Sequence, residues 1–163
     1  MYPFEVIEDI VFDLDGVFTD GTFYYSVEGK NLKKFGSHDA QAVNICKPYF
    51  NIHLISADSR GYLISESRSK DMGLILKLVP EKERANWIKN NFVKEKIALV
   101  VDSFTDIPSL PYVIRSFAPS DSHPELLERV TDRLICGGGK GAVAEVLEKL
   151  LYDKTKKHLW DFL

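Results

Sequence analysis

The stretch IEDIVFDLDG, residues 7–16, decides the fold. Residues 7–12 form an apolar run rich in Ile, Val and Phe, which predicts a buried β-strand. The run stops abruptly at Asp13-Leu14-Asp15-Gly16, where two carboxylates and a glycine follow one another closely. In an open parallel sheet, ligands bind at the carboxyl ends of the strands. The stretch therefore predicts a strand and, directly after it, a candidate site.

Strand-like and helix-like segments alternate along the rest of the chain. Apolar runs predict further strands at 52–55, 74–78, 97–101 and 113–117, with a remnant at 130–131. Helices are expected at 38–48, 59–72, 80–91, 124–129 and 141–152. Aromatic, β-prone runs around a Gly-containing turn in 21–35 predict a β-hairpin. This order predicts an α/β fold, a Rossmann-like three-layer sandwich with a mostly parallel sheet and a small hairpin.

Composition and charge narrow the function classes. The chain has 163 residues and a net charge of −3, and it lacks the excess of Lys and Arg that nucleic-acid binders carry. Its two cysteines are too few for a disulfide framework and fit a reducing compartment. The segment MYPFEVIED has no features of a secretion signal, and no apolar stretch reaches the length of a membrane span. We therefore expect a cytoplasmic protein with no nucleic-acid or membrane partner.

Polar side chains gather where the predicted strands end. Parallel strands bring their carboxyl ends to one edge of the sheet, so these side chains are expected to lie together. Clustered carboxylates repel one another unless a divalent cation neutralises them. A site built from oxygen ligands alone favours Mg²⁺. The set comprises Asp13 and Asp15 after the first strand, Ser56 and Asp58 after the second, Lys82 after the third, and Asp102 and Asp106 after the fourth.

The run FDLDGVFTDG resembles the first motif of haloacid dehalogenase superfamily phosphatases. The chain looks closest to the capless branch that contains 3-deoxy-D-manno-octulosonate 8-phosphate phosphatase. Lys34-Phe35 with Asp39, LISADS, Lys82, VDSFTD and GGGKGAVAEV stand where that branch has its later motifs. The resemblance covers nearly the whole chain. It implies a hydrolase domain over residues 1–152, a C-terminal tail over 153–163 and no large cap domain.

Carried over residue by residue, the resemblance implies an aspartyl-phosphate mechanism. Asp13 would attack phosphorus, and Asp15 would protonate the leaving oxygen and later activate water. Mg²⁺ would be held by the Asp13 carboxylate, the Asp15 backbone carbonyl and Asp102. Asp106 would lie behind the metal or add a further carboxylate to it. The alternative, purely structural roles are a polar turn for Asp13 and Asp15, and helix capping for Asp102 and Asp106.

Ser56 and Lys82 would bind the phosphoryl oxygens and stabilise the charge that spreads over them. The position of Lys82 at a predicted helix start supports this role. The competing interpretations are a strand-end hydroxyl for Ser56 and a solvated surface lysine for Lys82, with Lys70, Lys77 and Lys89 as rivals.

The sequence departs from the branch at three places. Ala57-Asp58 stands where Gly-Arg is common, Val101-Asp102-Ser103 replaces Gly-Asp-Asp, and Ala144 stands where Arg is usual. These changes predict a changed substrate or reduced activity. The leading hypothesis is a Mg²⁺-dependent phosphomonoester hydrolase acting on a small sugar phosphate, such as a 3-deoxy-octulosonate or nonulosonate phosphate. The alternative is a degenerate, weakly active or non-catalytic homologue that binds a partner in sugar-nucleotide biosynthesis.

The same resemblance implies a homo-oligomer, specifically a tetramer in which hairpins and tails close the sites of neighbours. The aromatic hairpin residues Phe23, Tyr24 and Tyr25 fit an interface, although they could equally pack on their own domain. Trp160 and Phe162 in the tail could reach a partner, or the tail could be disordered.

Overall fold

The first predicted strand lies inside a six-stranded sheet as β1 (Asp9–Asp13). The computed structural model describes residues 7–163. Most of the segment MYPFEVIED, for which the sequence predicted no secretion signal, therefore lies outside the described residues. The strand order is β5-β4-β1-β6-β7-β8, and every neighbouring pair is parallel. The other strands are β4 (Asn51–Ser56), β5 (Leu76–Leu78), β6 (Ile97–Val100), β7 (Arg115–Ala118) and β8 (Asp132–Arg133).

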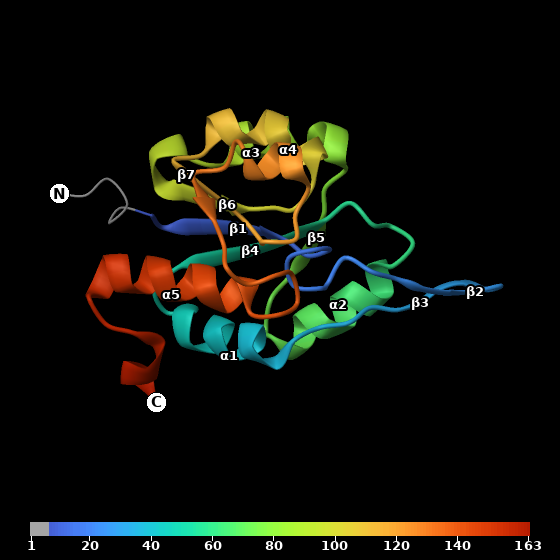
Figure 1. Ribbon diagram of the computed structural model, residues 1–163, viewed down its shortest axis with the longest axis horizontal. Helices are drawn as coiled ribbons and strands as arrows, with labels where there is room; N and C mark the ends of the chain where they lie inside the picture. Colours follow the sequence, from blue (N-terminus) through green and yellow to red (C-terminus); the bar gives the residue numbers. More distant parts are fainter. Residues whose placement is uncertain (1–6) are drawn as a thin grey trace.

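Helices cover both faces of the sheet and complete three layers (Figure 1). Successive side chains of β1 alternate between the faces, with Ile10 and Phe12 in one apolar core and Val11 in the other. The first core packs against α1 (Ser37–Cys46), α2 (Tyr62–Asp71) and α5 (Ala142–Thr155). The second packs against α3 (Glu81–Asn91), α4 (Pro124–Leu127) and the 3₁₀ segment η3 (Phe104–Tyr112). The predicted α/β sandwich with a mostly parallel sheet is confirmed.

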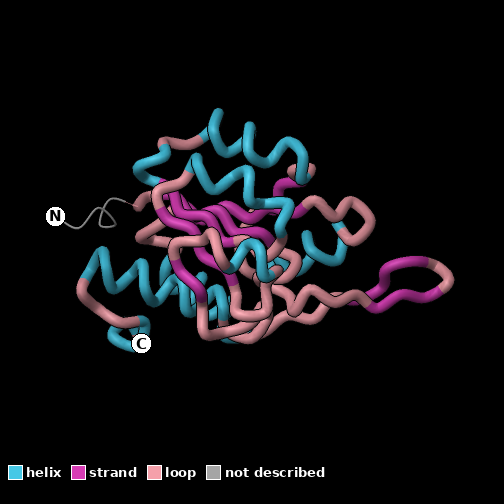
Figure 2. The backbone as a smooth tube through the Cα atoms, turned by 45° about the horizontal axis from the view of Figure 1, so that its top comes forward, coloured by secondary structure: helices cyan, strands magenta, loops and turns pink. Residues whose placement is uncertain are grey.

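The predicted hairpin is also present and projects away from the sandwich (Figure 2). Its strands, β2 (Tyr24–Ser26) and β3 (Gly29–Leu32), pair antiparallel. Between β1 and α1 the chain forms this hairpin and its connecting loops, which is too little for a cap domain. Tyr24, Tyr25 and Val27 are exposed on it. The return arm brings Lys33, the residue after β3, back to the body of the protein.

Two local predictions differ from the structure, and a segment for which the sequence predicted no element forms a 3₁₀ helix. The strand remnant lies at β8, two residues beyond Val130-Thr131, because the Thr131 hydroxyl oxygen accepts the Ser116 backbone N–H at 2.5 Å. The segment with Pro108 and Pro111 winds as the 3₁₀ helix η3. Helix α5 continues three residues past Tyr152 to Thr155.

The tail does not run free in the structure. It forms a 3₁₀ turn, η4 (Leu159–Phe162), and the ring of Phe162 lies 5.5 Å from that of Tyr49. Over residues 7–163, the chain contains no helix that combines the length and apolarity of a membrane span.

Candidate active site

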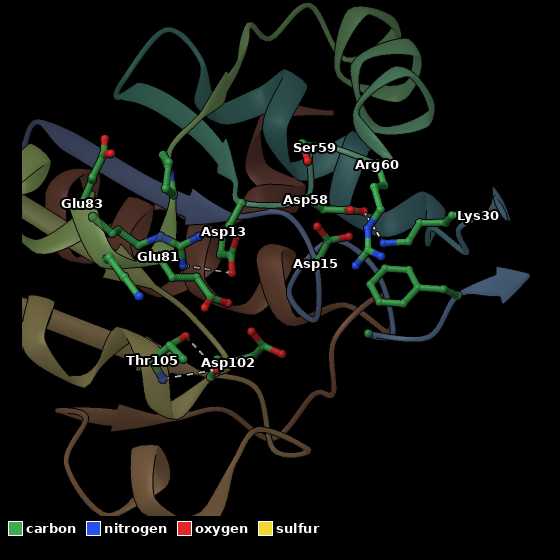
Figure 3. Close-up of a pocket in the computed structure, with 17 residues that line it drawn as sticks. Asp13, Asp15, Lys30, Asp58, Ser59, Arg60, Glu81, Glu83, Asp102 and Thr105 are labelled. Atoms are coloured by element: carbon green, nitrogen blue, oxygen red, sulfur yellow. Dashed lines mark hydrogen bonds and ion pairs between the residues drawn. The ribbon is translucent and has the colours of Figure 1, made fainter.

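A cavity of about 690 Å³ opens where β1, β4 and β6 end. Figure 3 shows Asp13, Asp15 and Asp102 around this space, with Lys30 and Arg60 on one side of it. The sequence predicted that carboxylates from separate strands would meet at one edge of the sheet, and the structure brings them there. Lys82 also lines the cavity but is exposed at its rim. Ser56 and Asp106 are fully buried and do not line it.

The loop after β1 is shaped by its own side chains. The Asp13 Oδ1 atom accepts the Leu14 backbone N–H at 2.9 Å. Gly16 has a φ of 81°, which favours glycine, and its N–H donates to the buried Thr19 Oγ1 at 3.0 Å. The same oxygen accepts the Gly21 N–H at 3.1 Å. These contacts give Thr19 a structural role in shaping the turn.

Three carboxylates converge beside this loop. One oxygen each from Asp13, Asp102 and Asp106 lies within 4.8 Å of the others. Burial raises the pKa of Asp13 well above its ordinary value, and the Arg84 guanidinium opposes that rise. Burial, followed by the charge of Asp106, raises the pKa of Asp102 to about 7. The buried Oδ2 of Asp106 has no hydrogen-bond partner among the described residues. Oxygen-only donors and an unsatisfied buried carboxylate oxygen both fit a divalent cation of the Mg²⁺ type.

The cation that contacts this cluster is Arg84, which the sequence argument did not consider. Its side chain is 2% exposed, and Nη1 and Nη2 lie 3.2 Å and 3.4 Å from the two oxygens of Asp13. Nη1 also makes a short contact with Asp106. Arg84 lies four residues before the buried Ile88 on the inner face of α3, and that spacing was the signal available. Lys82, two residues earlier, points to another side of the helix.

Asp15 is held from two sides. Lys33 Nζ donates to its Oδ1 at 2.6 Å, and Ser56 Oγ donates to its Oδ2 at 2.9 Å. Ser56 Oγ also accepts the Asp58 backbone N–H at 3.0 Å. The structure therefore places the predicted phosphate ligand Ser56 against Asp15 and the loop after β4.

The chain is similar in sequence and in fold to 3-deoxy-D-manno-octulosonate 8-phosphate phosphatases. No protein-family model matches the chain. It is 29% identical over 157 residues to 3-deoxy-D-manno-octulosonate 8-phosphate phosphatase KdsC of Salmonella typhi, covering 93% of this chain and 83% of that protein. The cobalt-bound enzyme of that type from Haemophilus influenzae superposes with a TM-score of 0.82 at 27% identity, over 94% of this chain and 92% of the other. The corresponding Yersinia pestis phosphatase gives 0.82 at 26% identity, over 94% and 85%.

These relatives and solved structures support a KdsC-like phosphatase of the haloacid dehalogenase superfamily. The family resemblance carried by FDLDGVFTDG is thereby confirmed, and so is the prediction of an enzyme that acts as a phosphatase.

The phosphatase compensates one of its departures internally. Asp58, which stands where the branch commonly has Arg, lies 2.5 Å from Lys30 Nζ and 2.9 Å from Lys33 Nζ. Burial opposes ionisation of Asp58, but the two lysines outweigh it and lower the pKa of Asp58 to about 2. The reversed charge is thus part of an ion-pair network on the hairpin side of the cavity.

The glycine cluster 137–141 packs against the loop that follows β1. A Cβ atom at Gly138 would lie 2.1 Å from the carbonyl oxygen of Gly16, so no side chain fits there. The Gly139 N–H donates to the Val17 carbonyl oxygen at 3.0 Å. The cluster thus forms a turn before α5 that packs closely against the Asp13 loop.

Proposed function

We propose that this phosphatase hydrolyses the phosphomonoester of a small sugar acid, through a phosphoryl group carried on Asp13 and with a divalent cation bound beside it. The observation that carries the proposal is the convergence of Asp13, Asp102 and Asp106 oxygens within 4.8 Å, with the Arg84 guanidinium against Asp13.

The cation would be held by the carboxylates of Asp13 and Asp102 and the backbone carbonyl of Asp15, with Asp106 behind them or as a further ligand. A bound Mg²⁺ would supply charge neutralisation at the phosphoryl oxygens. The cobalt-bound Haemophilus influenzae relative supports a divalent metal in this type of protein.

Each step of the proposed phosphoryl transfer is assigned to a side chain of the cavity or of its surroundings. The Asp13 carboxylate, whose ionised form Arg84 and a bound cation would both favour against the effect of burial, attacks phosphorus and forms a P–O bond while the bond to the leaving oxygen breaks. Asp15 delivers a proton to that oxygen and afterwards takes one from the water that releases phosphate from Asp13. Arg84 offers fixed donors where negative charge spreads. Lys82 at the rim would contact the phosphoryl group once substrate is bound. Ser56, which is buried and bonds to Asp15, would act by orienting that carboxylate.

The sugar-phosphate substrate follows from the relatives and the cavity. The curated relatives are named for 3-deoxy-D-manno-octulosonate 8-phosphate. A cavity of about 690 Å³ falls within the usual range for small-ligand sites, and Lys30 and Arg60 line its far side. We propose an eight- or nine-carbon 3-deoxy sugar acid phosphate, with the pairing of Asp58 altering the selectivity. A homotetramer joined through the exposed hairpin, in the cytoplasm, remains part of this proposal.

Phosphate release from a panel of phosphomonoesters, with and without Mg²⁺, tests the proposal. We expect Mg²⁺-dependent turnover and its loss in Asp13→Asn with the fold intact. Asp71→Asn, an exposed carboxylate on α2, is the matched control and should keep wild-type activity. Absence of metal-dependent release on every substrate would favour the alternative of a non-catalytic binding homologue.

A further inference from the structure

Lys33, at the base of the hairpin, contacts the proposed proton donor directly. Its Nζ atom lies 2.6 Å from Asp15 Oδ1, 2.7 Å from Ser65 Oγ and 2.9 Å from Asp58 Oδ2. An ammonium group has three N–H donors and no acceptor, so these three oxygens can use all of them. The side chain of Lys33 is 0% exposed.

We propose that Lys33 is a positioning residue that fixes the Asp15 carboxylate for proton transfer to the leaving oxygen. This assignment rests on the proposed function and adds to it a residue outside the four strand-end motifs. Lys33 keeps its own proton throughout. The transferred proton passes from Asp15 to the leaving oxygen as the P–O bond to that oxygen breaks and the bond to Asp13 forms.

The surroundings separate Lys33 from a substrate-binding lysine. Lys30, three residues earlier, lines the cavity and lies over the ring of Phe23 with Nζ 3.4 Å from its centroid. Lys33 does not line the cavity, and its donors already meet protein acceptors. A buried lysine without such partners would be costly, so the two carboxylates and the hydroxyl explain why the charge can reside there.

Asp15 needs an external restraint because it lies in the loop beyond β1. Lys33 and Ser56 each engage a different oxygen of its carboxylate, at 2.6 Å and 2.9 Å, and together they define the plane of the group. Each carboxylate oxygen has a second lone pair that remains available for a proton. Removing Lys33 would leave Ser56 alone on one oxygen and free the carboxylate to rotate.

The neighbouring backbone holds Lys33 in place. A Cβ atom at Gly61 would lie 2.8 Å from Lys33 Cε and 2.3 Å from Asp58 Oδ2, so the loop before α2 closes tightly over the network. Ser65, in the first turn of α2, supplies the third acceptor. Lys33 therefore ties three segments together: the hairpin base, the start of α2 and the catalytic loop.

The test compares two classes of phosphomonoester in Lys33→Met. An alkyl phosphate, taken as the best substrate of the panel, needs a proton on its leaving oxygen, whereas p-nitrophenyl phosphate releases a stable anion. The ratio kcat/KM reports phosphoryl transfer to Asp13 and not the later hydrolysis step. We expect kcat/KM to fall by about 100-fold for the alkyl phosphate and by less than about 5-fold for p-nitrophenyl phosphate, since a positioned general acid contributes about 10²–10⁴-fold.

Three further variants fix the interpretation. Lys33→Arg keeps a charged donor and is expected to restore part of the alkyl-phosphate rate. Lys30→Met removes the other ligand of Asp58 without touching Asp15, and should raise KM without the leaving-group bias. In an Asp15→Asn background, Lys33→Met should cause no further bias between the two substrate classes.

The outcomes separate the two proposals. Equal losses on both substrate classes in an active enzyme would overturn the positioning role and leave the proposed function standing. Absence of turnover by the wild type on any phosphomonoester would overturn the proposed function and this assignment with it. If Lys33→Met does not fold, Lys33→Gln keeps an amide donor and is judged by the same ratio of losses, where equal losses again overturn the assignment.

Discussion

Arg84 contacts both Asp13 and Asp106 inside the protein, and its replacement is the clearest perturbation of the site. Arg84→Met keeps the length and apolar stem of the side chain but leaves two buried carboxylates without their cation. Breaking a buried ion pair by removing one partner costs about 3–5 kcal/mol. One kcal/mol shifts the unfolding midpoint of a domain of this size by about 2–4 °C, so we expect a drop of about 6–20 °C.

Thermal unfolding in metal-free buffer is the assay, because a divalent cation could take over neutralisation of Asp13 and Asp106. Lys82→Met is the matched control on the same helix. Lys82 is exposed, and a surface substitution changes the free energy of unfolding by about 0.5 kcal/mol or less. Arg84→Lys should fall between the two, since it keeps the charge and loses the two-nitrogen contact with Asp13. An Arg84→Met midpoint within about 2 °C of the control would refute the reasoning.

Three other perturbations test separate features of the protein. Because the pKa of Asp102 is raised to about 7, the folded metal-free protein binds more protons than the unfolded chain between about pH 4 and pH 7. Its unfolding midpoint should therefore fall as pH rises through that window, and Asp102→Asn should flatten the slope; a midpoint that rises in both proteins would contradict this. Gly138→Ala should lower kcat by more than about 10-fold, because its Cβ would lie 2.1 Å from the Gly16 carbonyl oxygen and displace the Asp13 loop. The control is Lys140→Ala, at an exposed residue of the same loop, and equal activity of the two variants would disprove the packing role. Asp39→Ala should lower the free energy of unfolding by about 1–2 kcal/mol in denaturant titrations, because Asp39 Oδ1 accepts the Ala144 N–H at 3.0 Å in the first turn of α5. Asp39→Asn keeps an oxygen acceptor and should lose less stability, and the opposite order would count against capping.

The carboxylate cluster could be predicted because it depends on one rule of parallel sheets. Asp13 ends β1 and Asp102 follows β6, and these neighbouring parallel strands have their carboxyl ends at one edge of the sheet. The alternation of short apolar runs with helical segments likewise predicted the three-layer arrangement of sheet and helices. Neither inference needed the orientation of any helix or the path of any loop.

Arg84 and Lys33 could not be placed in that way. Which charged residue of Glu81-Lys82-Glu83-Arg84 faces the sheet depends on where the helix begins, and a shift of two residues moves the chosen side chain to another face. Lys33 depends on the return path of a hairpin whose register shifts between Tyr24 and Tyr25. The partners of Asp58 follow from the same return path, so the effect of its reversed charge was also hidden from the sequence.

The proposed function requires that Asp13 carry the phosphoryl group during turnover. Acid quenching of the Asp15→Asn variant during reaction with its best phosphomonoester, followed by peptide mass spectrometry, tests this directly. We predict one phosphoryl group, located on Asp13 and lost when Asp13 is replaced by asparagine. A phosphoryl group on another residue, or a wild-type enzyme that turns over with none on Asp13, would contradict the claim.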